Sequence, residues 1–154
     1  MRIGALEAGG TKMVCAVGDE KGNVLERESF PTLTPEETLP VLTKWFLERK
    51  VEALGIGAFG PTGVNPQAAS FGDILETPKL PWRGCHLRQA FFDALDVPVG
   101  YDTDVNAACL GEATFGDSKG IEDLVYVTIG TGVGAGVSFG MTVPDAIFAL
   151  QLRQ

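Results

Sequence analysis

The sequence predicts an α/β domain built on a mixed β-sheet, and three observations along its 154 residues lead to that class. Three strand-like segments joined by glycine turns open the chain, at residues 2–9, 12–19 and 24–30. Two further strand-like segments, 53–59 and 97–102, alternate with helical patterns. Tight turns favour antiparallel pairing, whereas strands that alternate with helices favour parallel pairing. We therefore expect a sheet that is antiparallel at one edge and parallel beyond it, with helices on both faces.

The first helix is predicted over residues 34–49. Thr34 is followed three residues later by Glu37, which is the spacing of a capping box, and Pro35 suits the first helical position. Pro40 follows one turn into the helix and predicts either a bend or a later start.

The remaining elements alternate to the end of the chain. Helices are expected over 83–95 and 105–116. Residues 71–82 form a long loop rich in turn residues, and long ordered loops are often functional. Residues 123–140 have the pattern of two strands with a glycine-rich turn, and the tail from 138 to 154 is short and suits a helix.

The composition excludes several classes of function. The formal net charge is −8, with 20 acidic and 12 basic residues, and the basic residues form no run. This argues against a nucleic-acid or anionic-membrane surface. No apolar run has the length of a membrane span and no secretory signal opens the chain, so we expect a cytoplasmic protein.

The cysteines indicate reduced thiols and no zinc site. There are three, well separated, with no CxxC pair and a single histidine in the chain. Cys85 is followed by His86, but neighbours in sequence rarely face each other as nucleophile and base, so we favour a structural role for both.

Two glycine-rich turns are candidates for phosphate binding. Residues 130–136 formally satisfy GxGxxG/A, but strand-like residues follow where a dinucleotide fold needs a helix, and the Walker pattern is absent. What remains is a pair of glycine hairpins, at 7–12 and 130–136, each with a threonine. Their backbone N–H groups could hold a polyphosphate from two sides, and plain turns are the alternative.

The strand at 97–102 brings Asp102 and Asp104 to its C-terminal end, where a helix begins. The carboxyl ends of parallel strands are where α/β folds bind ligands. An aspartate there has a plain role as a helix N-cap, while phosphoryl transfer to a hydroxyl needs a carboxylate that accepts the proton. The residues alone do not decide which aspartate does which.

Five motifs, in order, resemble those of the ROK sugar kinases, which belong to the actin-like ATPase superfamily with a ribonuclease H-like fold. They read GALEAGGTK, GAFGPTGVN, ETPKLPW, DTDVNAACLGE and VTIGTGVGAGV, between about Ile3 and Val137. EAGGTK together with TPKLPW is most similar to the bacterial fructokinase branch.

The resemblance implies two loops for the phosphates of ATP. The first comprises Gly9, Gly10, Thr11 and Lys12, and the second comprises Thr131, Gly132 and Gly134. Glu7 stands where the superfamily has an acidic residue that helps to hold Mg²⁺ through water.

The resemblance also implies a sugar site and a catalytic base. Asp104 matches the general base that takes the proton of the sugar hydroxyl, and it also contacts the sugar. Gly60 lies in the sugar site, Thr103 stands where many relatives have an Asn that contacts the sugar, and residues 77–82 form a loop on the substrate side.

The expected function is ATP-dependent phosphorylation of a hexose, with fructose first and fructose 6-phosphate as its product. We expect residues 1–117 to form the N-terminal kinase domain and 118–154 to begin a second, ATP-side domain that is truncated after its first strand pair. The family's zinc ligands do not occur in this chain, and the oligomeric state is open, with a homodimer compatible.

Two other readings remain at this stage. The chain could be a catalytically incomplete fragment that binds sugar or phosphate, or a plain mixed-sheet domain, which leaves the five ordered motifs unexplained. A third, the family's DNA-binding repressors, is disfavoured by the net charge of −8.

Overall fold

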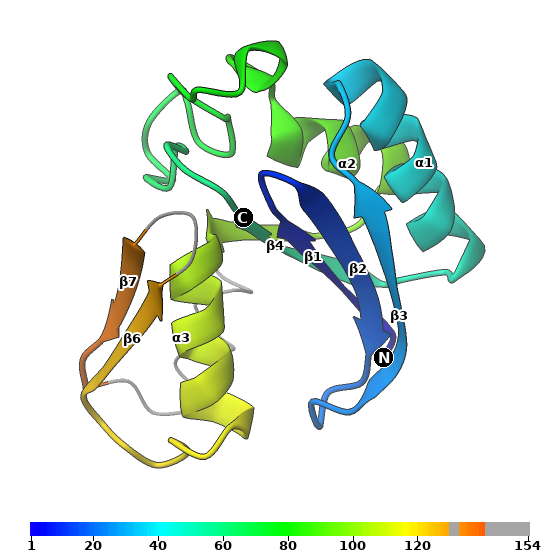
Figure 1. Ribbon diagram of the computed structural model, residues 1–154. Helices are drawn as coiled ribbons and strands as arrows, with labels where there is room; N and C mark the ends of the chain where they lie inside the picture. Colours follow the sequence, from blue (N-terminus) through cyan, green and yellow to red (C-terminus); the bar gives the residue numbers. More distant parts are fainter. Residues whose placement is uncertain (130–132, 141–154) are drawn as a thin grey trace.

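The computed structural model describes residues 1–129 and 133–140, and within them a five-stranded sheet has the order β3-β2-β1-β4-β5 (Figure 1). β1 pairs antiparallel with β2 and parallel with β4; β2 pairs antiparallel with β3, and β4 parallel with β5. The strands are β1 (Ile3–Ala8), β2 (Lys12–Gly18), β3 (Val24–Pro31), β4 (Ala53–Ala58) and β5 (Val99–Thr103). The predicted mixed sheet is thereby confirmed.

Helices cover the sheet on both faces, as predicted (Figure 1). They are α1 (Pro35–Glu48), α2 (Leu87–Leu95) and α3 (Asp104–Phe115), with a 3-10 turn, η1, at Leu80–Trp82. On one face, a Cβ added to Gly4 of β1 would touch the Phe46 ring of α1 at 3.1 Å. On the other, a Cβ added to Gly57 of β4 would stand 2.9 Å from the Cβ of Ala107 in α3.

The start of α1 agrees with the predicted capping box. The Thr34 N–H and hydroxyl both donate to the Glu37 carboxylate, at 3.3 and 3.0 Å. The later start suggested by Pro40 is wrong, because the helix runs unbroken from Pro35. Pro40 has no N–H for the Glu36 carbonyl four residues earlier, but Glu36 is exposed, so that carbonyl can bond to water instead.

The start predicted for α2 is also wrong. The helix begins at Leu87, four residues after the predicted Arg83. Gly84 has a φ of +69°, which no helical residue adopts, and its N–H donates to the Ile74 carbonyl at 2.8 Å. The Ile74 N–H in turn donates to the Cys85 carbonyl at 2.9 Å, so this backbone pairs with the preceding loop.

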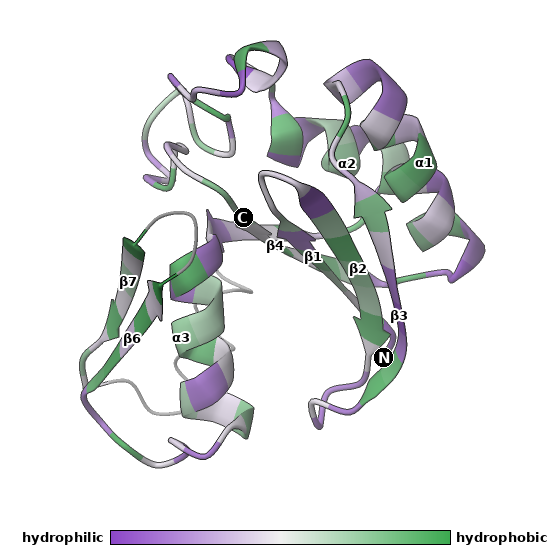
Figure 2. Ribbon diagram, in the orientation of Figure 1, coloured by the Kyte–Doolittle hydropathy of each residue, from purple (hydrophilic) through white to green (hydrophobic). Residues whose placement is uncertain are grey.

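The hydrophobic core lies between the sheet and the α1–α2 pair. Leu6, Met13, Leu42 and Phe46 are almost completely buried there, and Phe46 meets Phe91 edge to face with ring centroids 6.0 Å apart. The edge strand β3 is exposed except at Phe30, and its middle carries three consecutive charged residues, Glu26, Arg27 and Glu28 (Figure 2). Charges on an edge strand disfavour pairing with another chain.

A buried thiol and a buried tyrosine hydroxyl make the stability of the fold sensitive to high pH. Burial raises the pKa of the Cys15 thiol from 9.0 to about 12, and the pKa of the Tyr101 hydroxyl from 10.0 to about 12. Below pH 9 both groups keep their protons whether the chain is folded or not. Above it, the unfolded chain loses protons that the folded chain retains, so alkali favours unfolding.

We expect the free energy of unfolding to fall by about 1.4 kcal/mol per pH unit for each such group, from about pH 9 for Cys15 and from about pH 10 for Tyr101. Urea titrations at intervals from pH 8 to 11 measure this slope. Cys15→Ala removes one of the two thiols whose pKa burial raises from 9.0, the other being Cys85, so it should make the slope between pH 9 and 10 shallower. A stability equal at pH 8 and 10.5 would contradict the expectation.

A separate two-stranded sheet packs on α3 (Figure 1). It is the antiparallel pair β6 (Leu124–Ile129) and β7 (Val133–Ser138), as predicted for this segment. α3 carries apolar or small residues on most of its surface, which suits a helix held between two sheets. The helix suggested for the tail beyond Gly140 lies outside the described residues.

Candidate functional site

The predicted site residues of the N-terminal part gather at one edge of the five-stranded sheet. Gly9, Gly60 and Thr103 lie at or just beyond the carboxyl ends of the parallel strands β1, β4 and β5. The Phe59 N–H donates to the Ala8 carbonyl at 2.9 Å, which extends the pairing of β1 and β4 up to this edge. The carboxyl ends of parallel strands are where open α/β sheets bind ligands.

The turn between β1 and β2 is tied down by its neighbours. The Gly9 N–H donates to the Lys12 carbonyl at 3.1 Å, and the Thr32 hydroxyl donates to the Gly9 carbonyl at 2.8 Å. Among the hydrogen bonds of the described residues, none uses the N–H groups of Gly10 and Thr11. These N–H groups, on a fixed turn, suit an anion such as a phosphate.

The turn needs glycine at its first position. A Cβ on Gly9 would stand 2.5 Å from the Lys12 carbonyl oxygen, which belongs to the backbone and cannot give way. Gly10 is less constrained, since its closest neighbour at 3.1 Å is the end of the Lys79 side chain.

Glu7, Gly57 and Asp102 form a row across the sheet. Glu7 pairs with Gly57 on the neighbouring strand, and Gly57 pairs with Asp102 on the next, so all three present the same face. Two strand spacings put the backbones of Glu7 and Asp102 about 10 Å apart. Gly57 has no side chain, and Glu7 is exposed.

The donor set of this row fits Mg²⁺ bound largely through water. The described residues contain no group of three or more His, Cys, Asp or Glu that could enclose a metal ion. Mg²⁺ usually keeps several waters and uses one or two carboxylates together with substrate phosphates, so a single exposed carboxylate such as Glu7 is sufficient.

The two aspartates differ in their hydrogen-bond partners. The N-cap of α3 is Thr103, whose hydroxyl oxygen accepts from the Asn106 N–H at 3.1 Å, so neither aspartate caps the helix. Asp102 Oδ1 accepts from the Thr103 N–H and from the Asn106 side chain, both at 2.8 Å. Asp104, the first residue of α3, accepts only from the Val105 N–H, at 2.9 Å, among the described residues. Asp104 therefore has the carboxylate with more capacity left for a ligand.

The loop after β4 is held against β5. Thr62 donates its hydroxyl to the Asp73 carbonyl at 2.8 Å and also bonds to the Tyr101 hydroxyl. His86 Nδ1 bonds to the Asp73 carboxylate at 2.8 Å. Cys85 beside it is half-buried, and burial raises the pKa of its thiol to about 11, so it is protonated at neutral pH. Gly60 is exposed at the start of this loop.

The second glycine turn is described only in part. Thr131 and Gly132 lie outside the described residues, and Gly134 lies in β7. A Cβ on Gly134 would stand 2.8 Å from the Val105 side chain, so β7 touches α3 at the residue next to Asp104. The hairpin that carries the second predicted phosphate loop therefore reaches the start of α3.

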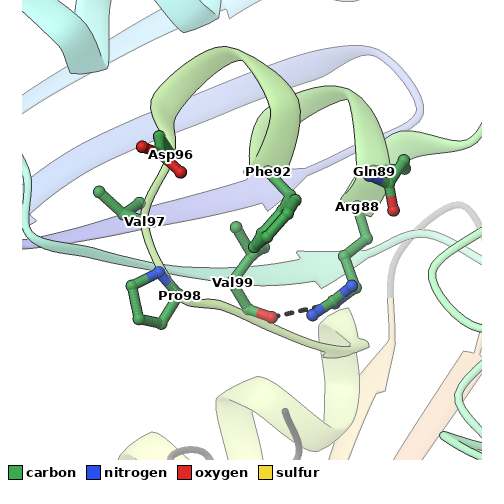
Figure 3. A pocket seen from close by; sticks show the side chains of 7 residues that line it. All are labelled: Arg88, Gln89, Phe92, Asp96, Val97, Pro98 and Val99. Atoms are coloured by element: carbon green, nitrogen blue, oxygen red, sulfur yellow. Dashed lines mark hydrogen bonds between the residues drawn. The ribbon is translucent and has the colours of Figure 1, made fainter.

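A surface hollow of about 360 Å³ lies at the opposite end of β5 (Figure 3). Arg88 of α2 crosses it, with its Nε donating to the Val99 carbonyl at 3.0 Å. The Arg88 guanidinium also lies over the Phe71 ring, 5.1 Å from its centroid. The arginine thus serves packing, and no predicted site residue lines this hollow.

Sequence reasoning missed two residues at the site. Asn106 carries a pattern signal, since it is the third residue of α3, a position from which a side chain can reach back to the N-cap region, where it meets Asp102. Lys79 carries none, because only the folded loop brings it to the Gly9–Lys12 turn.

Comparison with known proteins decides the family. The family model described as "ROK family" matches residues 3–144, somewhat beyond Val137, where the sequence motifs end. The chain belongs to the ROK family.

Similar ROK proteins include fructokinases. The chain is 48% identical over 141 residues to a fructokinase from Pediococcus pentosaceus, covering 89% of this chain and 48% of the relative. It is 44% identical over 133 residues to a fructokinase from Lactococcus lactis subsp. cremoris, covering 86% of this chain and 45% of that one. The chain thus spans about half the length of these relatives.

Among solved structures, a ROK family glucokinase from Streptomyces griseus, in complex with glucose and AMPPNP, is similar with a TM-score of 0.78. Its sequence is 31% identical, and the match covers 91% of this chain and 45% of that one. The fold of the chain is therefore the actin-like ATPase fold of the ROK sugar kinases. No helix among the described residues has both the length and the hydropathy needed to cross a membrane.

Proposed function

We propose that this chain contributes the sugar-side half of an ATP-dependent hexose kinase, a transferase of carbohydrate metabolism. The observation that carries the proposal is the arrangement at the carboxyl edge of the sheet. There the N–H groups of Gly10 and Thr11 have no hydrogen-bond partner among the described residues, Glu7 is exposed on the adjoining strand, and Asp104 has spare acceptor capacity. The fructokinase relatives and the glucokinase seen with glucose and AMPPNP support it.

Each group has a separate task in the proposed reaction. Asp104 orients the attacking sugar hydroxyl and accepts its proton, with its carboxylate fixed by the first turn of α3. The N–H groups of Gly10 and Thr11 bind phosphate oxygens, together with Lys12. Mg²⁺, when bound, neutralises charge on the transferred phosphoryl group, and Glu7 would help to hold it through water.

The sugar side comprises Gly60, Thr103 and Asp104. The exposed Gly60 leaves room at the end of β4, and Thr103 has its hydroxyl oxygen engaged with the Asn106 N–H. We propose fructose as the first sugar, converted to fructose 6-phosphate, because the fructokinases are 44% to 48% identical to this chain.

The second glycine loop and the domain division complete the proposal. Thr131, Gly132 and Gly134 would bind ATP phosphates from the side of β6 and β7. Residues 1–117 would form the sugar-side domain, and 118–154 would begin the ATP-side domain. The contact of Gly134 with Val105 supports this, since it brings the hairpin next to Asp104.

A coupled ADP-release assay with ATP, Mg²⁺ and a panel of hexoses tests the proposal, and thermal unfolding with each sugar is measured alongside. We expect fructose to give the highest kcat/KM and the largest rise in Tm. Asp104→Ala is the control that separates turnover from contaminating activity.

Two outcomes would change the proposal. A rise in Tm with fructose but no ADP release would favour a catalytically incomplete sugar-binding fragment. A chain that neither releases ADP nor gains stability with any hexose or ATP would overturn the kinase proposal.

A further inference from the structure

The loop that follows β4 brings a second lysine to the first glycine turn. A Cβ on Gly10 would stand 3.1 Å from Lys79 Cε and 3.9 Å from its Cδ, so the end of this side chain lies directly against the turn. Lys79 is 69 residues away in sequence, and this contact comes from the fold alone. The Lys79 ammonium is one bond beyond Cε, so it lies near the Gly10–Thr11 turn, whose N–H groups have no hydrogen-bond partner among the described residues.

The backbone of Lys79 is held firmly. Its N–H donates to the hydroxyl of Thr77 at 3.3 Å, and its carbonyl accepts from the Trp82 N–H at 2.9 Å. Both partners are nearly fully buried, Thr77 at 2% exposure and Trp82 at 1%. The Trp82 indole also donates to the Leu33 carbonyl at 2.8 Å, which ties the loop to the segment before α1.

Lys79 forms no salt bridge with a carboxylate in the described part of the chain. The acid nearest in sequence, Glu76, pairs with Arg83 at 3.1 Å. Glu37 lines the same hollow of about 500 Å³ as Lys79, but its carboxylate accepts from Thr34. A positioned ammonium without a carboxylate partner, next to the backbone N–H groups of a turn, is complementary to a polyanion.

Lys79 and Lys12 approach the turn from different sides of the sheet. Lys12 alternates with the buried Met13, so its side chain starts on the face that carries Glu7. Lys79 belongs to the loop whose Trp82 packs in the core cluster with Met13, on the other face. A phosphate on the turn would therefore have a cation on each flank.

We propose that Lys79 is a phosphate-binding residue of this site, which holds the terminal phosphates of the nucleotide against the Gly10–Thr11 turn. This rests on the proposed function. It gives the 77–82 loop a direct role at the phosphoryl group in addition to its expected place on the substrate side.

The test measures polyphosphate binding, which does not depend on turnover. Calorimetric titrations with inorganic tripolyphosphate and with Mg·ATP are made on the wild-type chain, Lys79→Met, Lys79→Arg and Lys44→Met. Lys44 is an exposed lysine of α1, 3.8 Å from Glu48, so its replacement makes the same change in net charge away from the turn. Amide NMR of Gly10 and Thr11 during the titration reports whether the ligand sits on the turn.

We expect Lys79→Met to weaken tripolyphosphate and Mg·ATP about tenfold, as the loss of one charge-assisted hydrogen bond implies. Lys79→Arg should retain most of the affinity and Lys44→Met nearly all of it. The unligated Tm of Lys79→Met should stay close to that of the wild-type chain, because the anchoring side chains are Thr77 and Trp82.

The outcomes separate this proposal from the one on which it rests. If the wild-type chain binds polyphosphate at the turn and Lys79→Met binds it equally well, the role of Lys79 is overturned and the kinase proposal stands. An equal loss in Lys44→Met would also overturn it, since only net charge would matter. If the wild-type chain binds neither ligand and the Gly10 and Thr11 amides do not shift, both proposals fall.

Discussion

Asp104→Asn is expected to lower kcat for hexose phosphorylation by a factor of about 10² to 10⁴, which is the range for loss of a general base. The substitution keeps the shape of the side chain, and its carbonyl oxygen can still accept from the Val105 N–H. What it removes is the ability to take the proton of the sugar hydroxyl. Steady-state kinetics should show the loss in kcat, with the rise in Tm caused by fructose largely retained.

Asp102→Asn is the matched control, two residues away and with the same chemical change. Asp102 Oδ1 accepts two hydrogen bonds, from Thr103 and Asn106, and an asparagine carbonyl can accept both. We expect kcat to fall less than about tenfold, because the geometry of the first turn of α3 is preserved. Equal losses in the two variants, or an Asp104→Asn that retains a tenth of the activity, would contradict the assignment.

Gly136→Ala should loosen the packing of the β6–β7 hairpin on α3. A Cβ there would stand 2.4 Å from the Val105 carbonyl oxygen and 3.0 Å from the Cys109 Cβ, and a backbone carbonyl inside a helix cannot move aside. Overpacking of this kind costs about 1–3 kcal/mol, and we expect the urea midpoint to fall accordingly. The KM for ATP should rise as well, since the hairpin carries the second predicted phosphate loop.

Gly111→Ala is the control within α3 itself. A Cβ at Gly111 meets nothing within 4 Å, and alanine favours a helix over glycine by about 1 kcal/mol. This variant should therefore be slightly more stable than the wild-type chain. If Gly136→Ala were as stable as Gly111→Ala, the close approach of β7 and α3 would not hold in solution.

Local signals predicted most of the fold. The start of α1 at Pro35 needed only the Thr34–Glu37 pair and a proline that suits the first turn. The start of α2 could not be placed, because the left-handed Gly84 pairs with Ile74, a contact made only after the loop has folded. The prediction of a late start at Pro40 was wrong because the cost of a proline inside a helix depends on whether water can reach the carbonyl left without a partner, and the sequence does not show this exposure.

The residues of the candidate site likewise fall into those that could be placed from the sequence and those that could not. The strand ends placed Gly9, Gly60 and Asp104 at one edge, as the topology of parallel strands requires. Thr103 caps α3 because the helix begins at Asp104, and Thr103, the residue before it, has the extended backbone that an N-cap needs. Lys79 remained hidden because no periodicity links it to Gly10, only the fold of an irregular loop.

α3 touches both sheets where they carry glycine. Gly57 of the large sheet would meet Ala107 and the Asp104 backbone, and Gly134 and Gly136 of the hairpin would meet Val105. Such contacts interlock few side chains, so they resist rotation of one sheet relative to the other less than interdigitated packing would. The points of contact lie within the first turns of the helix, next to Asp104. A rotation of one sheet relative to the other about these contacts would therefore displace Asp104, the proposed proton acceptor, least.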